Sequence, residues 1–139
     1  MNENTISLTS EERTWATLAH LSILLNLVTG FLGVLAALII YLVYKDKSRY
    51  VAYQSLQATL FQLIFWAGAG LLAGLVWGLT IPLMLIIVGF CMLPFAILIS
   101  IVPIAAIIYG VVAGIQTGQG DDFQYWLVGR WVRGTLTGE

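Results

Sequence analysis

The sequence predicts an all-α integral membrane protein: a small bundle of three to four transmembrane helices, the first two short and hairpin-like, plus a C-terminal interfacial amphipathic helix. Hydrophobic residues make up 60% of the 139 residues and charged residues 9%, whereas soluble domains carry about 25% charged residues. From Tyr50 to Gly120 there is no Asp, Glu, Lys or Arg. Because about 20 helical residues cross the ~30 Å hydrocarbon core of a bilayer, this stretch suffices for more than one crossing.

The apolar runs also favour helices over a β-barrel, the other fold that satisfies backbone polar groups in lipid. Barrel strands alternate apolar and polar residues over about 10 positions, whereas residues 81–114 are almost continuously apolar. We therefore divide the chain into a polar N-terminal tail (1–9), a transmembrane helical domain (10–119) and a C-terminal interfacial segment (120–139). The first ten residues are polar and have no basic region before an apolar run, which argues against a cleaved signal peptide.

The first helix is predicted to begin near Ser10. Thr9 and Glu12 have the spacing of a capping box, in which each side chain bonds the backbone N–H of the other residue. Residues 14–44, as one helix, would be about 46 Å long, which is long for one span and short for two. The apolar pattern is interrupted at Asn26, Thr29, Gly30 and Gly33. We favour a hairpin that turns near 26–30, with a single long span as the alternative.

Two further spans follow. The uncharged stretch 54–77 is expected to end in a turn marked by Gly78, Thr80 and Pro82. Residues 82–115 contain Pro94 and Pro103, and proline kinks a helix because it removes a backbone hydrogen bond. We expect one bent span centred on residues 92–114, preceded by an interfacial start near Pro82.

The last segment is predicted to be a helix that lies on the membrane surface. Asp121 or Asp122 can cap it. An apolar face would contain Phe123, Trp126, Leu127 and Trp131, and a polar face Gln124, Arg130 and Arg133. Tryptophan favours the headgroup zone, and an amphipathic helix of this kind lies in the interface plane.

Basic residues set the expected orientation, because they accumulate on the cytoplasmic side of membranes. Three of the six Lys and Arg residues lie in the loop 45–49. We therefore expect a multi-pass protein of the cytoplasmic (inner) membrane, with this loop and both termini in the cytoplasm. The residues expected to contact cytoplasmic headgroups are Lys45, Lys47, Arg49, Trp126, Arg130, Trp131 and Arg133.

Small residues recur at intervals of four in two places, and residues at that spacing share one helix face. In lipid, such faces let two helix backbones approach closely. We predict helix packing at both stripes, against each other or against a second protein. The stripes are Gly70, Gly74 and Gly78, and Ala106, Gly110, Gly114 and Gly118.

Five polar residues lie in apolar surroundings: His20, Asn26, Gln54, Gln57 and Gln62. Intramembrane polar residues normally face the bundle interior and are functional candidates. Amides also stabilise bundles by bonding between helices, for about 0.6 kcal/mol on average. We favour this structural role for the glutamines and for His20, with a proton-relay or ligand role for His20 as the alternative.

The chain shows no arrangement of residues for catalysis, metal binding or cofactor binding. It has one His and one Cys, and the apolar stretch holds no charge. It has no glycine-rich phosphate loop and no basic stripe that would bind nucleic acid. The expected partners are the lipid bilayer and other membrane subunits or further copies of this chain.

Three motifs resemble a bacterial membrane family of unknown function related to the Tic-twenty channel protein of the chloroplast inner-envelope translocon. They are EERTWATLAHLS (11–22), IIYLVYKDKSRYVAYQSLQATLFQ (39–62) and AIIYGVVAGIQTGQGDDFQYWL (106–127). The family's His and Lys after the loop are absent here, where residues 52–57 read AYQSLQ. The resemblance implies a four-helix bundle with both termini on one side.

Three functions are compatible with these observations. A small non-catalytic accessory or scaffold subunit fits the glycine stripes and the uncharged interior. A protein-translocation or channel component is implied only by the resemblance, since a polar face is confined to 54–62. A membrane enzyme lacks candidate residues. We favour the accessory subunit.

Overall fold

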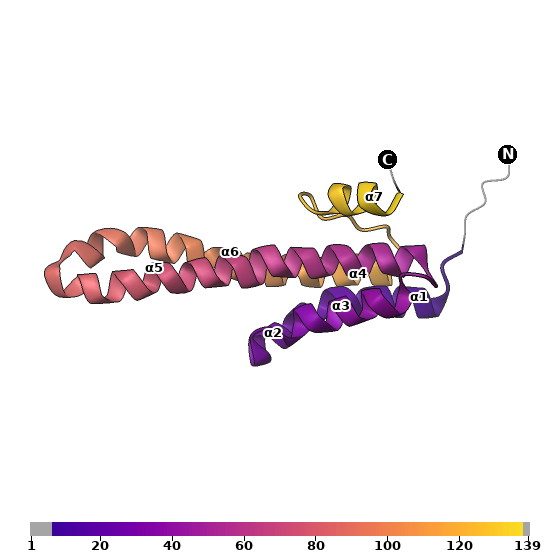
Figure 1. Ribbon diagram of the computed structural model, residues 1–139, viewed down its shortest axis with the longest axis horizontal. Coiled ribbons are helices and arrows are strands. Elements are labelled where there is room, and N and C mark those ends of the chain that lie inside the picture. The colour runs from indigo at the N-terminus through magenta and orange to yellow at the C-terminus, as the bar shows by residue number, and fades with distance from the viewer. Residues whose placement is uncertain (1–6, 138–139) are drawn as a thin grey trace.

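The computed structural model describes residues 7–137, which form helices and connecting turns without a β-strand. Residues 1–6, most of the predicted polar tail, and 138–139 lie outside the described part. Figure 1 shows the elements in order: α1 (Ser10–Leu21), α2 (Ile23–Thr29), α3 (Leu32–Tyr44), α4 (Arg49–Phe61), the π-helical η1 (Gln62–Gly68), α5 (Ala69–Leu83), the 3₁₀ turn η2 (Met84–Ile86), α6 (Val88–Gly118) and α7 (Gly129–Thr137).

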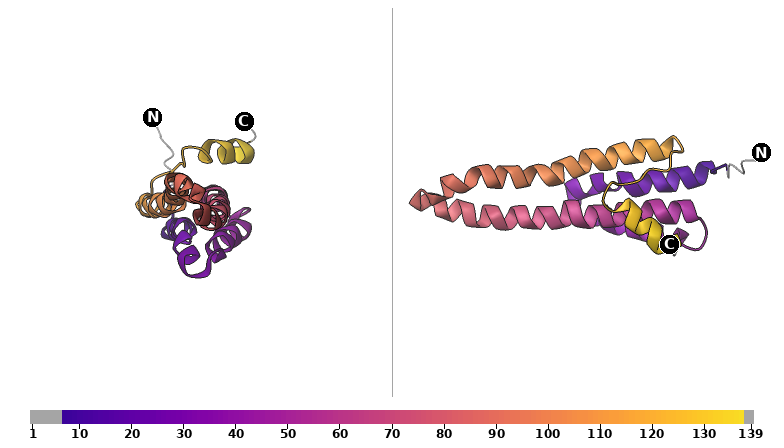
Figure 2. Two further views of the ribbon diagram at one scale, coloured as in Figure 1. Left: turned by 90° about the vertical axis from the view of Figure 1, so that its left-hand side faces the viewer. Right: turned by 90° about the horizontal axis from the view of Figure 1, so that it is seen from above.

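Two long helical stretches form the frame of the molecule. Arg49–Ile86 and Val88–Gly118 are both long and apolar enough to cross a membrane, and they run side by side as a hairpin (Figures 1 and 2). The 31 residues of α6 measure about 46 Å. Other segments cover only one end of this frame. Of the predicted three to four transmembrane helices, the first two of them short, the described residues therefore contain two that are long and apolar enough to cross a membrane.

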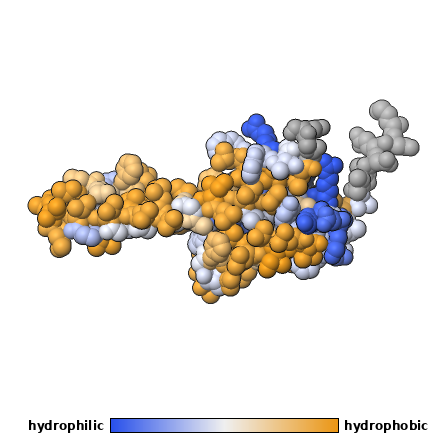
Figure 3. Space-filling model, viewed as in Figure 1, coloured by the Kyte–Doolittle hydropathy of each residue, from blue (hydrophilic) through white to orange (hydrophobic). Residues whose placement is uncertain are grey.

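The molecule therefore has two regions. In the bundle end, α1 packs against α3, α4 and α6, and α7 packs on α4. In the projecting hairpin, which we define as residues 69–105, α5 and the first half of α6 contact each other without cover from the other helices (Figure 1). The surface of the projecting hairpin is almost wholly apolar, and the hydrophilic residues gather at the opposite end of the molecule (Figure 3).

The start of α1 confirms the predicted capping box. The Glu12 backbone N–H donates to Thr9 Oγ1 at 3.1 Å, and the Thr9 backbone N–H donates to a Glu12 carboxylate oxygen at 2.9 Å. Glu12 also accepts a hydrogen bond from Ser48 Oγ at 2.7 Å. The cap therefore ties the beginning of α1 to the beginning of α4.

Residues 10–44 turn back on themselves at Gly30, as the hairpin interpretation expects. Gly30 has φ of +81°, a left-handed conformation that glycine adopts without steric cost. Gly33, just after the turn, allows close contact between the arms: a Cβ atom there would lie 2.1 Å from the Ser22 carbonyl oxygen. Glycine is therefore needed at position 30 for its backbone conformation and at position 33 for lack of space.

The turn of the long hairpin lies further along the chain than predicted. The helix passes Gly78 and Thr80 and includes Pro82 in its last turn, and the reversal comes at 84–88. Pro82 is the second-last residue of α5, and α6 contains both Pro94 and Pro103 inside its length.

The C-terminal segment also differs from the prediction. The last helix begins at Gly129, not at Asp121, and residues 119–128 are irregular. Phe123 and Tyr125 are buried while Gln124 and Trp126 are exposed. This alternation is the period of extended chain. The predicted helical face that joined Phe123 to Trp126 is therefore wrong, because tertiary contacts draw alternate residues inward.

Candidate functional site: a buried polar network at the bundle end

A network of polar side chains lies between α1, α4 and the C-terminal segment. Gln54 and Gln57 are fully buried on α4, and Gln62 is 1% exposed at the start of η1. Gln57 and Gln62 follow Gln54 by three and eight residues, which places the three amides on one side of the helix, and that side faces α1 and the C-terminal segment. Burying an amide is costly unless it is hydrogen-bonded, so the partners of these amides decide whether the site is stable.

His20 connects α1 to both other elements. Its Nε2 lies 2.9 Å from Gln54 Oε1 and its Nδ1 lies 3.1 Å from the Tyr125 hydroxyl. The Gln54 amide nitrogen donates to Asp122 at 3.2 Å and to the Phe123 carbonyl at 3.1 Å, which assigns Oε1 as the acceptor facing His20. The neutral ring therefore carries its proton on Nε2, and Nδ1 accepts from Tyr125.

Gln57 holds the backbone of the C-terminal segment. Its amide nitrogen donates to the Phe123 carbonyl at 2.7 Å and to Gln54 Oε1 at 2.6 Å. Its carbonyl oxygen accepts from the Tyr125 backbone N–H at 3.2 Å. An irregular segment has backbone groups that no helix satisfies, and the two glutamines supply the missing partners.

A second group of bonds lies deeper, near the turn between α2 and α3. Asn26 Nδ2 donates to Gln62 Oε1 at 3.0 Å, and Asn26 Oδ1 accepts from the Gly33 backbone at 2.8 Å. Gln62 Nε2 donates to Ser22 Oγ at 3.0 Å. These bonds join the short hairpin (residues 10–44) to the long hairpin (residues 49–118), at the point where α4 changes into η1.

Aromatic rings close the network from the side. Tyr125 is 1% exposed and stacks on Phe61 with ring centroids 3.9 Å apart. Tyr109 and Phe123 meet Tyr125 edge to face, at 5.2 and 4.9 Å. Offset and edge-to-face pairs add stability beyond area burial, and here they come from α4, α6 and the C-terminal segment.

This arrangement is suited to holding helices together. Both ring nitrogens of His20 form hydrogen bonds within the protein, and so do the amide oxygen and nitrogen of Gln54. Among residues 7–137, no three His, Cys, Asp or Glu side chains are placed to hold a metal ion. The five polar residues singled out from the sequence all lie in this network, which we treat as the structural centre of the molecule.

The two glycine stripes have different surroundings. A Cβ atom at Gly110 would lie 3.0 Å from Ile23, and one at Gly114 would lie 2.8 Å from Leu21, so the second stripe packs on the short hairpin of the same chain. Ala106 is also buried, and Gly118 faces Thr17. A Cβ atom at Gly70, Gly74 or Gly78 would meet no atom within 4 Å.

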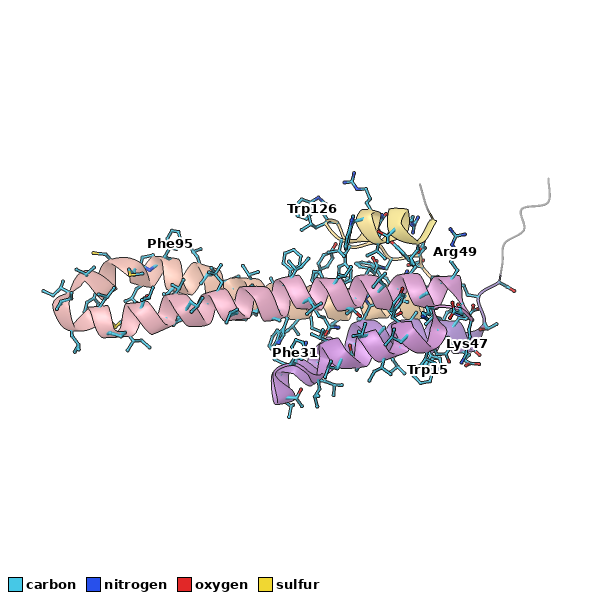
Figure 4. The ribbon with its side chains drawn as sticks, viewed as in Figure 1. Trp15, Phe31, Lys47, Arg49, Phe95 and Trp126 are labelled. Carbon is cyan, nitrogen blue, oxygen red and sulfur yellow. The ribbon has the colours of Figure 1, made fainter. Side chains whose placement is uncertain are left out.

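The residues expected at headgroups are not all at one end. Figure 4 shows Lys47 and Arg49 at the end opposite the projecting hairpin, whereas Trp126 lies nearer the middle of the molecule, where it lines a pocket with Ile101 and Val102. Lys45 and Arg130 are exposed as well. Arg133 forms an ion pair with Asp122 and lies 4.7 Å from the Tyr53 ring centre. Trp126 is 73% and Trp131 65% exposed.

Sequence reasoning missed the importance of Tyr125 and Phe123. Both were assigned to a surface helix or passed over, yet they supply a hydroxyl, a carbonyl and two rings to the centre. The sequence carried only a partial signal, since Gln124 separates the aromatic residues Phe123 and Tyr125 but Tyr125 is followed directly by Trp126, which is exposed. A period of two indicates extended chain rather than helix.

Comparison with known proteins identifies the family. The profile of the magnetosome magnetite crystal formation protein family, MamF/MmsF, matches residues 11–132, and the chain belongs to this family. No curated protein and no solved structure matches the chain. The assignment to a Tic-twenty-related family is therefore wrong: all three motifs on which it depended lie within the range that the magnetosome family matches. The membership agrees with a membrane location.

Proposed function

We propose that this member of the magnetosome magnetite crystal formation protein family is a non-catalytic, multi-pass accessory subunit that packs its projecting hairpin against other membrane proteins or further copies of itself. The observation that carries the proposal is the uncovered glycine face of α5, where a Cβ atom added at Gly70, Gly74 or Gly78 would meet nothing within 4 Å. Helices associate in lipid through close packing at small residues, because no hydrophobic force drives them together there.

The length of α6 supports the same role. The whole helix, of which the first half lies in the projecting hairpin, is about 46 Å long, whereas the hydrocarbon core of a bilayer is ~30 Å thick. The turn at 84–88 is apolar throughout, and Leu85 is 89% exposed. A helix longer than the bilayer tilts or associates with neighbours. A partner along α5 would cover part of this surplus apolar surface.

The family description names magnetite crystal formation, and we assign this chain to that process as an organiser of membrane partners. Three of the acidic side chains are already engaged within the chain: Glu11 bonds Tyr44, Glu12 bonds Ser48, and Asp122 pairs with Arg133.

The proposed orientation places the loop 45–49 and both termini in the cytoplasm, since basic residues favour that side. Lys47 is exposed at the tip of this loop. Lys47→Cys, in a Cys91→Ser background, should resist an impermeant thiol reagent in intact cells and react after permeabilisation. Labelling in intact cells would reverse the orientation.

Native gels in mild detergent test the accessory role. Gly74→Leu adds a branched side chain on the open face, and overfilling a tight contact costs about 1–3 kcal/mol, enough to weaken assembly about tenfold. The isolated chain should keep its thermal stability, because nothing in the chain contacts this position. Gly114→Leu is the matched control, since it overfills a contact with Leu21 inside the chain and should lower the thermal stability itself. Assembly of Gly74→Leu like the wild type would refute the proposal.

A further inference from the structure

A pocket between the start of α4 and α7, which we call the arginine pocket, lies far from the proposed packing face of α5. It has a volume of about 300 Å³ and is lined by Arg49, Tyr50, Tyr53, Asp122, Arg133 and Leu136. Figure 4 shows Arg49 at the end of the molecule opposite the projecting hairpin. The walls come from α4, α7 and the irregular segment before α7, so only the folded chain brings the two arginines together.

Arg133 is the fixed cation of the arginine pocket. It forms an ion pair with Asp122, and its guanidinium lies 4.7 Å from the centre of the Tyr53 ring. Asp122 is held in turn by the Gln54 amide nitrogen at 3.2 Å. The Arg133 side chain is nevertheless 44% exposed. A ligand in the pocket can therefore reach this guanidinium without any change in the fold.

Arg49 is the cation of the pocket whose charge the chain does not compensate. It is exposed at the first position of α4. Within residues 7–137 its side chain forms no ion pair or hydrogen bond, since the one ion pair joins Arg133 to Asp122. Two basic side chains and one acidic side chain line the arginine pocket, so its walls carry an excess positive charge.

A second pocket extends this positive surface. It has a volume of about 320 Å³ and adjoins the arginine pocket, since Arg49 and Leu136 line both. It adds Lys45 and Lys47 of the loop, with Asp46 as the acidic residue in its lining. Concave surfaces lined mainly by one sign of charge concentrate ligands of the opposite sign. The two pockets together therefore favour an anionic ligand.

We propose that the arginine pocket binds the phosphate of an anionic phospholipid, with Arg49 as its main contact. A guanidinium presents a planar fork of N–H groups that matches phosphate oxygens, and Arg133 adds a second positive charge on the α7 wall. Trp131, on the same short helix as Arg133, is 65% exposed, and tryptophan favours the headgroup zone of membranes. Leu136 gives the pocket an apolar side for the lipid glycerol. These two residues favour a lipid over a free phosphate ion.

The test measures lipid bound by the full-length protein. Protein in a neutral detergent is titrated with phosphatidylglycerol or phosphatidylcholine, and the bound lipid is counted by native mass spectrometry. We expect preferential binding of phosphatidylglycerol. Arg49→Gln should weaken this binding about tenfold, the loss expected for one hydrogen bond between charged groups. Arg130→Gln removes an equal charge from an exposed site on α7 that lines neither pocket and should change binding less than about twofold.

Arg49→Lys separates geometry from charge and keeps the test valid if Arg49→Gln does not fold. Lysine keeps the positive charge but lacks the planar fork, so this variant should bind phosphatidylglycerol more weakly than the wild type and more tightly than Arg49→Gln. Thermal unfolding of each variant shows that it is folded.

Four results would each overturn the proposal. Equal losses for Arg49→Gln and Arg130→Gln would show general surface attraction, and equal affinity for the two lipids would show that the headgroup charge is not recognised. Undiminished binding by Arg49→Lys would leave no role for the guanidinium. Displacement of phosphatidylglycerol by inorganic phosphate would show a site for free anions.

Discussion

The bundle end and the projecting hairpin contain parts of the same two long helices but differ in what lies on their faces. In the bundle end, α4 presents Gln54 and Gln57 to partners on α1 and the C-terminal segment, and both amides are fully buried. In the projecting hairpin, α5 and α6 meet mainly through apolar side chains, with one side-chain bond from Trp77 to Ser100 at 2.9 Å. Directional bonds fix the first region, whereas the second depends mainly on packing.

The glycines of the bundle end and those of the α5 stripe show the same difference, whereas Gly89 at the turn of the projecting hairpin is enclosed by the backbone of residues 80–84. Gly33, Gly110 and Gly114 are tightly enclosed by other parts of the chain, whereas Gly70, Gly74 and Gly78 are open. A glycine in a helix costs about 1 kcal/mol relative to alanine. In the bundle end this cost is offset by close contact within the chain. On α5 no other part of the chain packs closely on the glycines, so nothing within the chain offsets this cost. Close packing against a partner would offset it.

The largest effect is expected from Gly33→Ala, which tests the enclosed glycines. The new Cβ atom would lie 2.1 Å from the Ser22 carbonyl oxygen, and backbone would have to move. We expect a loss of about 3 kcal/mol in the free energy of unfolding, at the upper end for overpacking. Thermal or denaturant unfolding in detergent measures it.

Gly78→Ala is the matched control, because a Cβ atom there meets nothing within 4 Å. It should leave stability unchanged or raise it by up to about 1 kcal/mol through helix propensity. Equal losses in the free energy of unfolding for Gly33→Ala and Gly78→Ala would show that the glycines of the two regions do not differ in how tightly they are packed.

An intermediate effect is expected from Gln54→Leu, which tests the directional bonds. The change leaves the His20 Nε2–H without its acceptor, and a buried donor without a partner costs about 1–3 kcal/mol. We expect a loss of about 2 kcal/mol, measured in the same unfolding assay. Gln116→Leu is the control, since Gln116 is exposed on α6.

Adding His20→Leu to Gln54→Leu sharpens this result. Replacing both partners by apolar groups is less harmful than replacing one, so the double variant should lose less than the sum of the two single variants. Strict additivity would mean that the bond between His20 and Gln54 makes no contribution.

The smallest effect is expected from pH at the cap of α1. The hydrogen bonds from Ser48 and from the Thr9 backbone lower the pKa of Glu12 below its ordinary value of 4.5. A lowered carboxyl pKa gives stability that is present above the unfolded-state value and is lost as pH falls through the folded-state value. Stability should therefore decline below about pH 4.5, by less than about 1 kcal/mol for so exposed a group.

Glu12→Gln should remove most of this decline, because the amide does not titrate. Comparison of the pH dependence of unfolding with that of the wild type measures the contribution. A variant with the same acid profile as the wild type would assign the decline to other carboxylates, and the cap would then have no electrostatic role.

The sequence by itself determined the membrane class, the helical fold and the cap of α1, because composition, uninterrupted apolar runs and capping residues act locally. It also identified the five polar residues of the centre, since polar side chains in apolar segments must find partners. Their partners were decided by tertiary structure. Phe123 and Tyr125 enter the bundle because buried glutamines satisfy an extended backbone that local helix preference would not predict. Tertiary structure also decided the position of the turn at 84–88 and the different surroundings of the two glycine stripes. Both depend on which helix lies opposite, and contacts between residues far apart in the sequence cannot be predicted from a local pattern.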